Sequence, residues 1–208
     1  MKQKLIGILA LSAVLFAACN NSATTNKHEG DEKIKDTAQH ATIADNKEIK
    51  AVAVTFTNVD PKAAASFTEI VNHYLHVKNA LANDNSDEAA SGAKALRKGL
   101  DQLDKSFFTA EQKAVYDKDE EELKEHAEHI GKNGDNIKHQ RSHFSLLSEV
   151  MYNLVKAFGG GKALYHDHCP MYNEDKGGAM WLSETAEVKN PYFGAEMPKC
   201  GTVEEVIK

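Results

Sequence analysis

Apolar residues recur at intervals of three and four in four successive segments between residues 61 and 160. This spacing gathers them on one face of an α-helix. The four stripes are Phe67, Ile70, Tyr74, Val77 and Leu81; Ala89, Ala93, Leu96, Leu100, Leu103 and Phe107; Val115 or Tyr116, Leu123, His126 and Ile130; and Ile137, Phe144, Leu147, Met151, Leu154 and Phe158. The pattern therefore predicts four amphipathic helices.

Short connections between these segments make consecutive helices antiparallel neighbours, and each stripe can be buried only against the others. We therefore predict an up-down-up-down four-helix bundle over residues 61–160. The helical period disappears after Gly161, where proline, glycine and aromatic residues follow. A segment this short cannot enclose its own core, so residues 161–208 are expected to pack on the bundle as an irregular cap, with Trp181 as an apolar anchor. The predicted fold class is all-α.

The first part of the chain has the pattern of a targeting segment. A basic start precedes an apolar run at residues 5–18, which is too short to cross the ~30 Å hydrocarbon core and fits a signal peptide. Small residues stand before Cys19, and this arrangement resembles the lipobox of bacterial lipoproteins. The resemblance implies that residues 1–19 are a signal peptide and that Cys19 is lipidated. Residues 20–60 are then a flexible polar tether, with a short extended piece at residues 51–56.

Composition limits the function classes. The chain is 41% hydrophobic and 27% charged, close to the soluble globular average, which excludes a polytopic membrane protein. Its net charge of -6 and its lack of long Lys and Arg clusters argue against nucleic-acid binding. It contains no Gly-x-Ser-x-Gly or His-Glu-x-x-His motif, so we expect a binding protein and no enzyme.

Residues 161–208 concentrate side chains that bind metals. Six candidate ligands lie there: His166, His168, Cys169, Met171, Met197 and Cys200. Cu(I) prefers thiolate and thioether ligands and accepts imidazole, so methionines beside the cysteines favour copper. Zn(II) would instead take four Cys and His ligands in a tetrahedron, a set that the two histidines and two cysteines also supply.

The two cysteines allow a second interpretation that involves no metal. A periplasmic protein with two mature cysteines, in a region lacking a core, often oxidises them to a structural disulfide, here Cys169–Cys200. The nearby methionines then only fill gaps. A redox-sensitive pair, metal-binding when reduced and cross-linked when oxidised, would join both interpretations. The residues alone leave these alternatives open.

A second group of histidines is expected on the bundle. His126 and His129 are three apart on the third predicted helix, and His139 and His143 are four apart on the fourth. Each spacing places a pair on one helix face. Across a tight antiparallel turn, the residue numbers of two facing positions have a nearly constant sum. His126 is therefore expected opposite His143, and His129 opposite His139. These four residues are a secondary metal candidate, and the alternative is that His126 is a half-buried core histidine.

The tail resembles a bacterial domain of unknown function, and the similarity covers roughly residues 63–203. The matching residues are Cys169-Pro170-Met171, Trp181-Leu182-Ser183, Asn190-Pro191-Tyr192-Phe193-Gly194, Met197 and Cys200-Gly201. That domain occurs alone in periplasmic lipoproteins and fused to periplasmic adaptor subunits of copper/silver-type heavy-metal efflux pumps. The resemblance implies a helical bundle with a cap and an association with copper handling.

From these observations the chain is expected to be a periplasmic lipoprotein, held at a membrane by its lipid anchor. It would bind a soft heavy-metal ion, with Cu(I) preferred over Zn(II) or no metal, for buffering or for delivery to efflux. The alternative is a structural or interaction module that docks on an efflux adaptor or another envelope protein, with Cys169 and Cys200 as a disulfide. Neither function involves nucleic acid.

Overall fold

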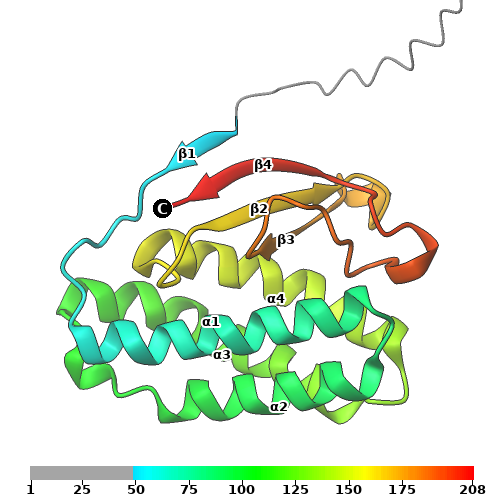
Figure 1. The fold of residues 1–208 in the computed structure, drawn as a ribbon. Coiled ribbons are helices and arrows are strands. Elements are labelled where there is room, and N and C mark those ends of the chain that lie inside the picture. Colours follow the sequence, from blue (N-terminus) through cyan, green and yellow to red (C-terminus); the bar gives the residue numbers. More distant parts are fainter. Residues whose placement is uncertain (1–48) are drawn as a thin grey trace, which may run out of the picture. The chain divides into compact units, whose positions relative to one another are not determined.

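Four helices run side by side with short connections: α1 (Pro61–Ala82), α2 (Ser86–Gln102), α3 (Ala110–Lys132) and α4 (Ile137–Phe158) (Figure 1). The structure is a computed structural model that describes residues 49–208. The predicted signal peptide, Cys19 and the tether up to residue 48 lie outside the described residues. Among residues 49–208, no helix has the length and apolar character needed to cross a membrane.

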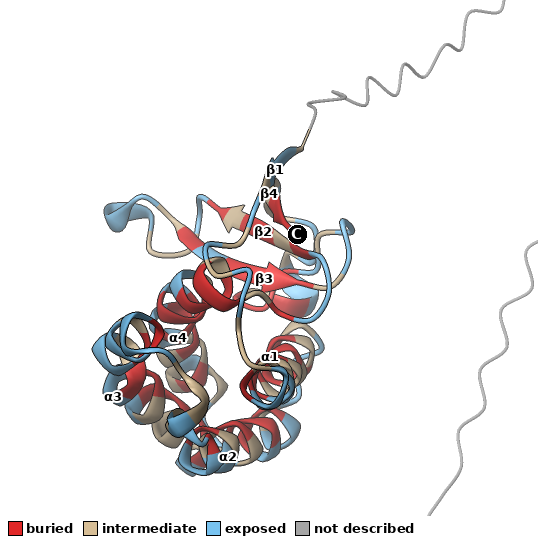
Figure 2. Ribbon diagram, turned by 90° about the vertical axis from the view of Figure 1, so that its left-hand side faces the viewer, coloured by how far each residue is buried: buried red, intermediate tan, exposed pale blue. Residues whose placement is uncertain are grey.

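The predicted four-helix arrangement is confirmed. Figure 2 views the helices nearly end-on, with buried positions on their inner sides. The ring of Tyr74 stacks on that of Phe144 with centroids 5.2 Å apart, which packs α1 on α4. A capping box starts α3, because Thr109 accepts from the backbone N–H of Gln112 and Gln112 accepts from that of Thr109. The second stripe extended to Phe107, but α2 ends at Gln102, and Phe107 lies in a 3₁₀ turn.

The all-α prediction and the irregular cap are wrong, because the C-terminal region contains a four-stranded mixed sheet. Its strands are β1 (Lys50–Val52), β2 (Leu164–Cys169), β3 (Ala179–Ser183) and β4 (Thr202–Ile207), in the order β1-β4-β2-β3. β1 is parallel to β4, and the other neighbours are antiparallel. The sheet covers α1 and α4 (Figures 1 and 2). The strands are short and one carries a bulge, so their two-residue period is too brief to stand out among the turn residues.

The last part of the predicted tether is folded against the bundle and the sheet. β1 pairs with β4. The backbone N–H groups of Thr55 and Phe56 donate to the carbonyls of Lys156 and Ala157, both at 2.9 Å. These carbonyls belong to the last turn of α4, which leaves such groups without helical partners. The segment before α1 therefore satisfies the end of α4.

Two tyrosine hydroxyls, one from α1 and one from the loop before β4, form hydrogen bonds with the outer edge of β3. The hydroxyl of Tyr74 accepts from the backbone N–H of Leu182 at 3.0 Å and lies 2.8 Å from Ser148 Oγ. The hydroxyl of Tyr192 donates to the carbonyl of Met180. Residues 180 and 182 are two apart in β3, so their backbone groups point to the same edge of the strand. No other strand within residues 49–208 covers this edge. These contacts fix the sheet on α1 and α4.

An arginine holds the loop before β4 against the bundle. Arg141 of α4 donates from Nε to the Pro191 carbonyl at 2.8 Å and from Nη2 to the Leu81 carbonyl at 3.0 Å. The same Nη2 lies 2.6 Å from Asp84 Oδ1, and Asp84 Oδ2 accepts from the Ala195 N–H at 2.8 Å. The hydrogen bond from Ala195 and the arginine beside it lower the pKa of Asp84.

Candidate metal-binding sites

Two thiols from separate parts of the C-terminal region lie next to each other. Cys169 ends β2 and is buried, while Cys200 precedes β4 and is half-buried. Their Sγ atoms are 3.2 Å apart, and both cysteines are free. Burial and the neighbouring thiol raise the pKa of Cys200. We call these two residues the thiol pair.

The strand register brings the thiol pair together. β2 and β4 are antiparallel with His168 opposite Thr202, so the chain just before β4 passes the end of β2. Gly201 makes this approach possible. Its φ is +146°, and a Cβ there would lie 2.8 Å from the Trp181 ring and 3.0 Å from the His168 carbonyl oxygen. A glycine is therefore required where Cys200 turns into β4.

The two predicted histidine ligands of β2 lie elsewhere. His166 is buried, stacks on Tyr152 of α4 with ring centroids 3.9 Å apart, and has Nδ1 4.0 Å from Glu205 Oε1. Burial lowers the pKa of His166 to about 4. His168 places Nε2 2.9 Å from the Gly177 carbonyl oxygen. Within residues 49–208, neither imidazole forms a ligand group with both thiols inside 4.8 Å.

Position along β2 accounts for this separation, because His166 precedes Cys169 by three residues and His168 lies next to Cys169, where side chains alternate between faces. A bulge between His166 and Asp167 leaves both of these neighbours buried. Cys169 is buried as well, while the intervening His168 is only half-buried. Of the predicted thioethers, Met171 is 55% exposed and Met197 is half-buried. The structure thus brings together two of the six predicted tail ligands.

The sequence did not reveal that two ionisable side chains, Lys78 and Asp167, are buried beneath the sheet. Lys78 of α1 is buried, with Nζ 3.2 Å from Ser183 Oγ and 3.1 Å from Glu184 Oε2. Asp167 is fully buried, and desolvation raises its pKa to about 8 despite the positive charge of Lys78. Lys78 stands four residues after Tyr74 and three before Leu81, so helical periodicity places it beside the apolar stripe of α1. Only the β3 strand above it, which the sequence pattern did not predict, explains its burial.

The predicted histidine group on the bundle is present. Among residues 49–208, His129, His139 and His143 form the one group of three or more His, Cys, Asp or Glu side chains whose ligand atoms all lie within 4.8 Å of one another. His126 adjoins them, with Nδ1 3.2 Å from Nδ1 of His143. The ring centroids of His129 and His139 are 5.7 Å apart. The pairing expected across the turn is therefore observed, and we call these four residues the histidine cluster.

The surroundings favour the neutral form of two members of this cluster, His143 and His126. Burial and the adjacent histidines lower the pKa of His143 to about 4, and burial also lowers that of His126. The carboxylate of Glu122 lies 3.7 Å from His126 Nε2 and opposes this shift, as does the charge of Glu125. Nε2 of His139 is buried and has no hydrogen-bond partner. Neutral imidazole is the form that binds metals.

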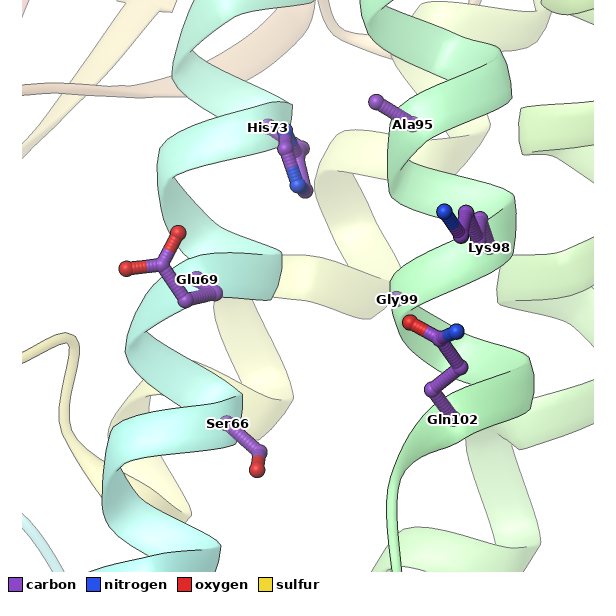
Figure 3. A pocket seen from close by; sticks show the side chains of 7 residues that line it. All are labelled: Ser66, Glu69, His73, Ala95, Lys98, Gly99 and Gln102. Carbon is purple, nitrogen blue, oxygen red and sulfur yellow. The ribbon is translucent and has the colours of Figure 1, made fainter.

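A groove with a volume of about 390 Å³ lies between α1 and α2 (Figure 3). Its lining residues are Ser66, Glu69, His73, Ala95, Lys98, Gly99 and Gln102. None of them belongs to the thiol pair or the histidine cluster. The groove offers one histidine and no cysteine, so we do not assign it a metal-binding role.

Comparison with known proteins finds a similarity that covers part of the chain. Residues 70–163 match a protein family described only as being of unknown function (DUF3347). The match covers most of α1, the other three helices and the connection between α4 and β2. No curated protein and no solved structure shows significant similarity to the chain.

Proposed function

We propose that the protein is a lipid-anchored protein of the bacterial periplasm that binds the soft ion Cu(I), for buffering or for delivery to efflux. The observation that carries this proposal is the 3.2 Å approach of the Sγ atoms of Cys169 and Cys200. Two thiolates that share one ion lie further apart than this, at about 3.8 Å for the zinc–sulfur distance of about 2.3 Å and a tetrahedral angle. The thiol pair must therefore open by about 0.6 Å for that geometry, and by more for a wider angle at the ion.

The donors around the thiol pair favour Cu(I) over Zn(II). Zn(II) takes four ligands in a tetrahedron, whereas His166 and His168 are directed to other partners. Cu(I) is selected by thiolate and thioether ligands. Met171 follows one cysteine by two residues and Met197 precedes the other by three, so each thiol has a thioether close to it in the sequence, which we propose as a further ligand.

The remaining parts of the proposal come from sequence resemblance. The lipobox-like segment before Cys19 supports a lipid anchor, and the tail motif resembles domains fused to periplasmic efflux adaptors. An efflux adaptor is accordingly the partner that we propose for ion delivery.

One specific observation also supports a second function. The thiol pair connects the end of β2 to the chain before β4, so its oxidation would lock two strands together. In that form the protein would be an interaction module that docks on an efflux adaptor or another envelope protein and uses no metal.

Titration with Cu(I) tests the first function. The full chain, reduced and purified in detergent without a polyhistidine tag, is titrated against a competing Cu(I) chelator beside the C169S/C200S variant. We expect one tightly bound Cu(I) in the parent and at least a tenfold weaker affinity in the variant. Equal affinities would refute Cu(I) binding by the thiol pair.

Methionine variants provide a matched comparison. M171L and M197L remove the two thioethers beside the cysteines, and M180L removes a third that is also exposed. We expect weaker Cu(I) binding in the first two and unchanged binding in M180L. The second function instead predicts a native protein two hydrogens lighter than the reduced chain by intact mass, with a melting temperature that Cu(I) leaves unchanged.

A further inference from the structure

The histidine cluster has the composition of a site for a different kind of ion. Its only donors are imidazole nitrogens, which suit divalent Zn, Cu and Ni, whereas the thiol pair suits a soft monovalent ion. His139 and His143 are one turn apart on α4, and His129 faces them from α3. An ion bound there would join the two helices beside their connecting turn, residues 133–136.

The distances are close to those of a metal centre. One nitrogen from each of His129, His139 and His143 lies within 4.8 Å of the others. Nitrogens bound to one ion at about 2.0–2.1 Å are about 3.4 Å apart in a tetrahedron. The rings of His129 and His143 are stacked, with centroids 4.1 Å apart and planes 6° apart, so one ring must turn to aim its lone pair at the ion. Rotation about χ2 of histidine has broad minima and allows this.

Two further observations indicate a ligand. Nε2 of His139 is buried without a hydrogen-bond partner, a costly state for a polar atom that an ion would relieve. The neighbouring His126 contacts His143 through Nδ1 at 3.2 Å and has Glu122 3.7 Å from its other nitrogen. In known metal sites, carboxylates and other hydrogen-bonding groups behind the ligands orient the histidines that bind the metal. Glu122 and His126 are placed to orient His143 in the same way.

The local charge also favours a cation. A pocket of about 310 Å³ adjoins His129 and is lined by Arg97, Lys124 and three glutamates, Glu121, Glu125 and Glu128. Arg97 pairs with Glu128, and Lys124 pairs with other carboxylates, so both positive charges are offset. The excess of carboxylates raises the local concentration of divalent cations.

We infer that His129, His139 and His143 form a binding site for a divalent transition-metal ion, Cu(II) or Zn(II), with His126 orienting His143. This site is independent of the thiol pair and of the proposed Cu(I) function. The order of affinities for nitrogen ligands places Cu(II) above Zn(II).

The test uses the full chain carrying C19S, C169S and C200S, in detergent and without a polyhistidine tag, so that no thiol contributes. ZnCl₂ and CuSO₄ are titrated separately against a chelator at pH 7.5. We expect one equivalent of each ion to bind, Cu(II) more tightly, with affinities at least tenfold lower in H139A and in H143A. H73A removes a histidine of α1 outside the cluster and should leave both affinities unchanged.

A second measurement guards against misfolded variants. A hundredfold excess of Zn(II) over Kd should raise Tm by about 5–10 °C in the thiol-free parent and by much less in H129A. Circular dichroism of the metal-free variants checks that each is folded. Absence of a stoichiometric ion in the parent, or equal affinity in H139A, H143A and the parent, would overturn the site. Because the thiols are absent, neither result bears on Cu(I) binding.

Discussion

The hydroxyl of Tyr74 offers a sharp test of how the sheet is held on the bundle. It accepts from the Leu182 N–H at 3.0 Å and lies 2.8 Å from Ser148 Oγ, and both contacts are buried. Y74F removes the oxygen and leaves the N–H on the open edge of β3 without a partner. A buried donor left unsatisfied costs about 1–3 kcal/mol. For a protein of this size that corresponds to a fall in Tm of roughly 2–12 °C.

Tyr116 supplies the matched control. Its ring is equally buried, but its hydroxyl has no hydrogen-bond partner. Y116F removes an oxygen that makes no bond, so we expect unchanged or slightly higher stability. Both variants are compared with the parent by urea unfolding and by thermal melting monitored by circular dichroism. Equal stability of Y74F and Y116F would refute the view that this hydroxyl anchors β3.

Three further predictions concern titrating groups and the loop before β4. The pKa of Asp84 is lowered in the fold, so its contribution to stability is present above about pH 4 and is lost in more acidic solution; D84N should weaken this acid dependence in pH-dependent melting. The pKa of Asp167 is raised to about 8, so the parent loses stability as pH rises from about 4 to 8; D167N should gain on the parent over this range, and parallel curves would contradict the assignment. G194A places a Cβ against the Asp84 carboxylate at a φ of +53° and should cost more than 1 kcal/mol by urea unfolding, whereas G177A, at a position with open space, should cost less.

The helices and the histidine cluster were predictable because both depend on local spacing. A period of three and four fixes which residues of a helix face its neighbours, and a short turn fixes which positions lie opposite across it. His126 and His143 were therefore paired from their positions in the chain alone. Burial then followed for residues such as Leu123 and Leu147.

The sheet was not predictable in the same way, because it depends on contacts between distant segments. β1 pairs with β4 across most of the chain, and the bulge after His166 breaks the alternation that marks β2 as a strand. In a regular strand, residues three apart point to opposite faces, whereas the bulge leaves His166 and Cys169 both buried. The burial of Lys78 was missed for the same reason, since it follows from the position of β3.

The two candidate sites differ in what controls them. The thiol pair depends on how β2 and β4 are aligned and on the redox state of two sulfurs, whereas the histidine cluster depends only on the turn between α3 and α4. Oxidation of Cys169 and Cys200 removes the thiolates as ligands and leaves the imidazole nitrogens of the cluster unchanged. α4 carries His139 and His143 of the cluster near its start, and further along its Tyr152 stacks on His166 of β2. Under oxidising conditions the proposed Cu(I) site is therefore closed, while the inferred divalent site stays open.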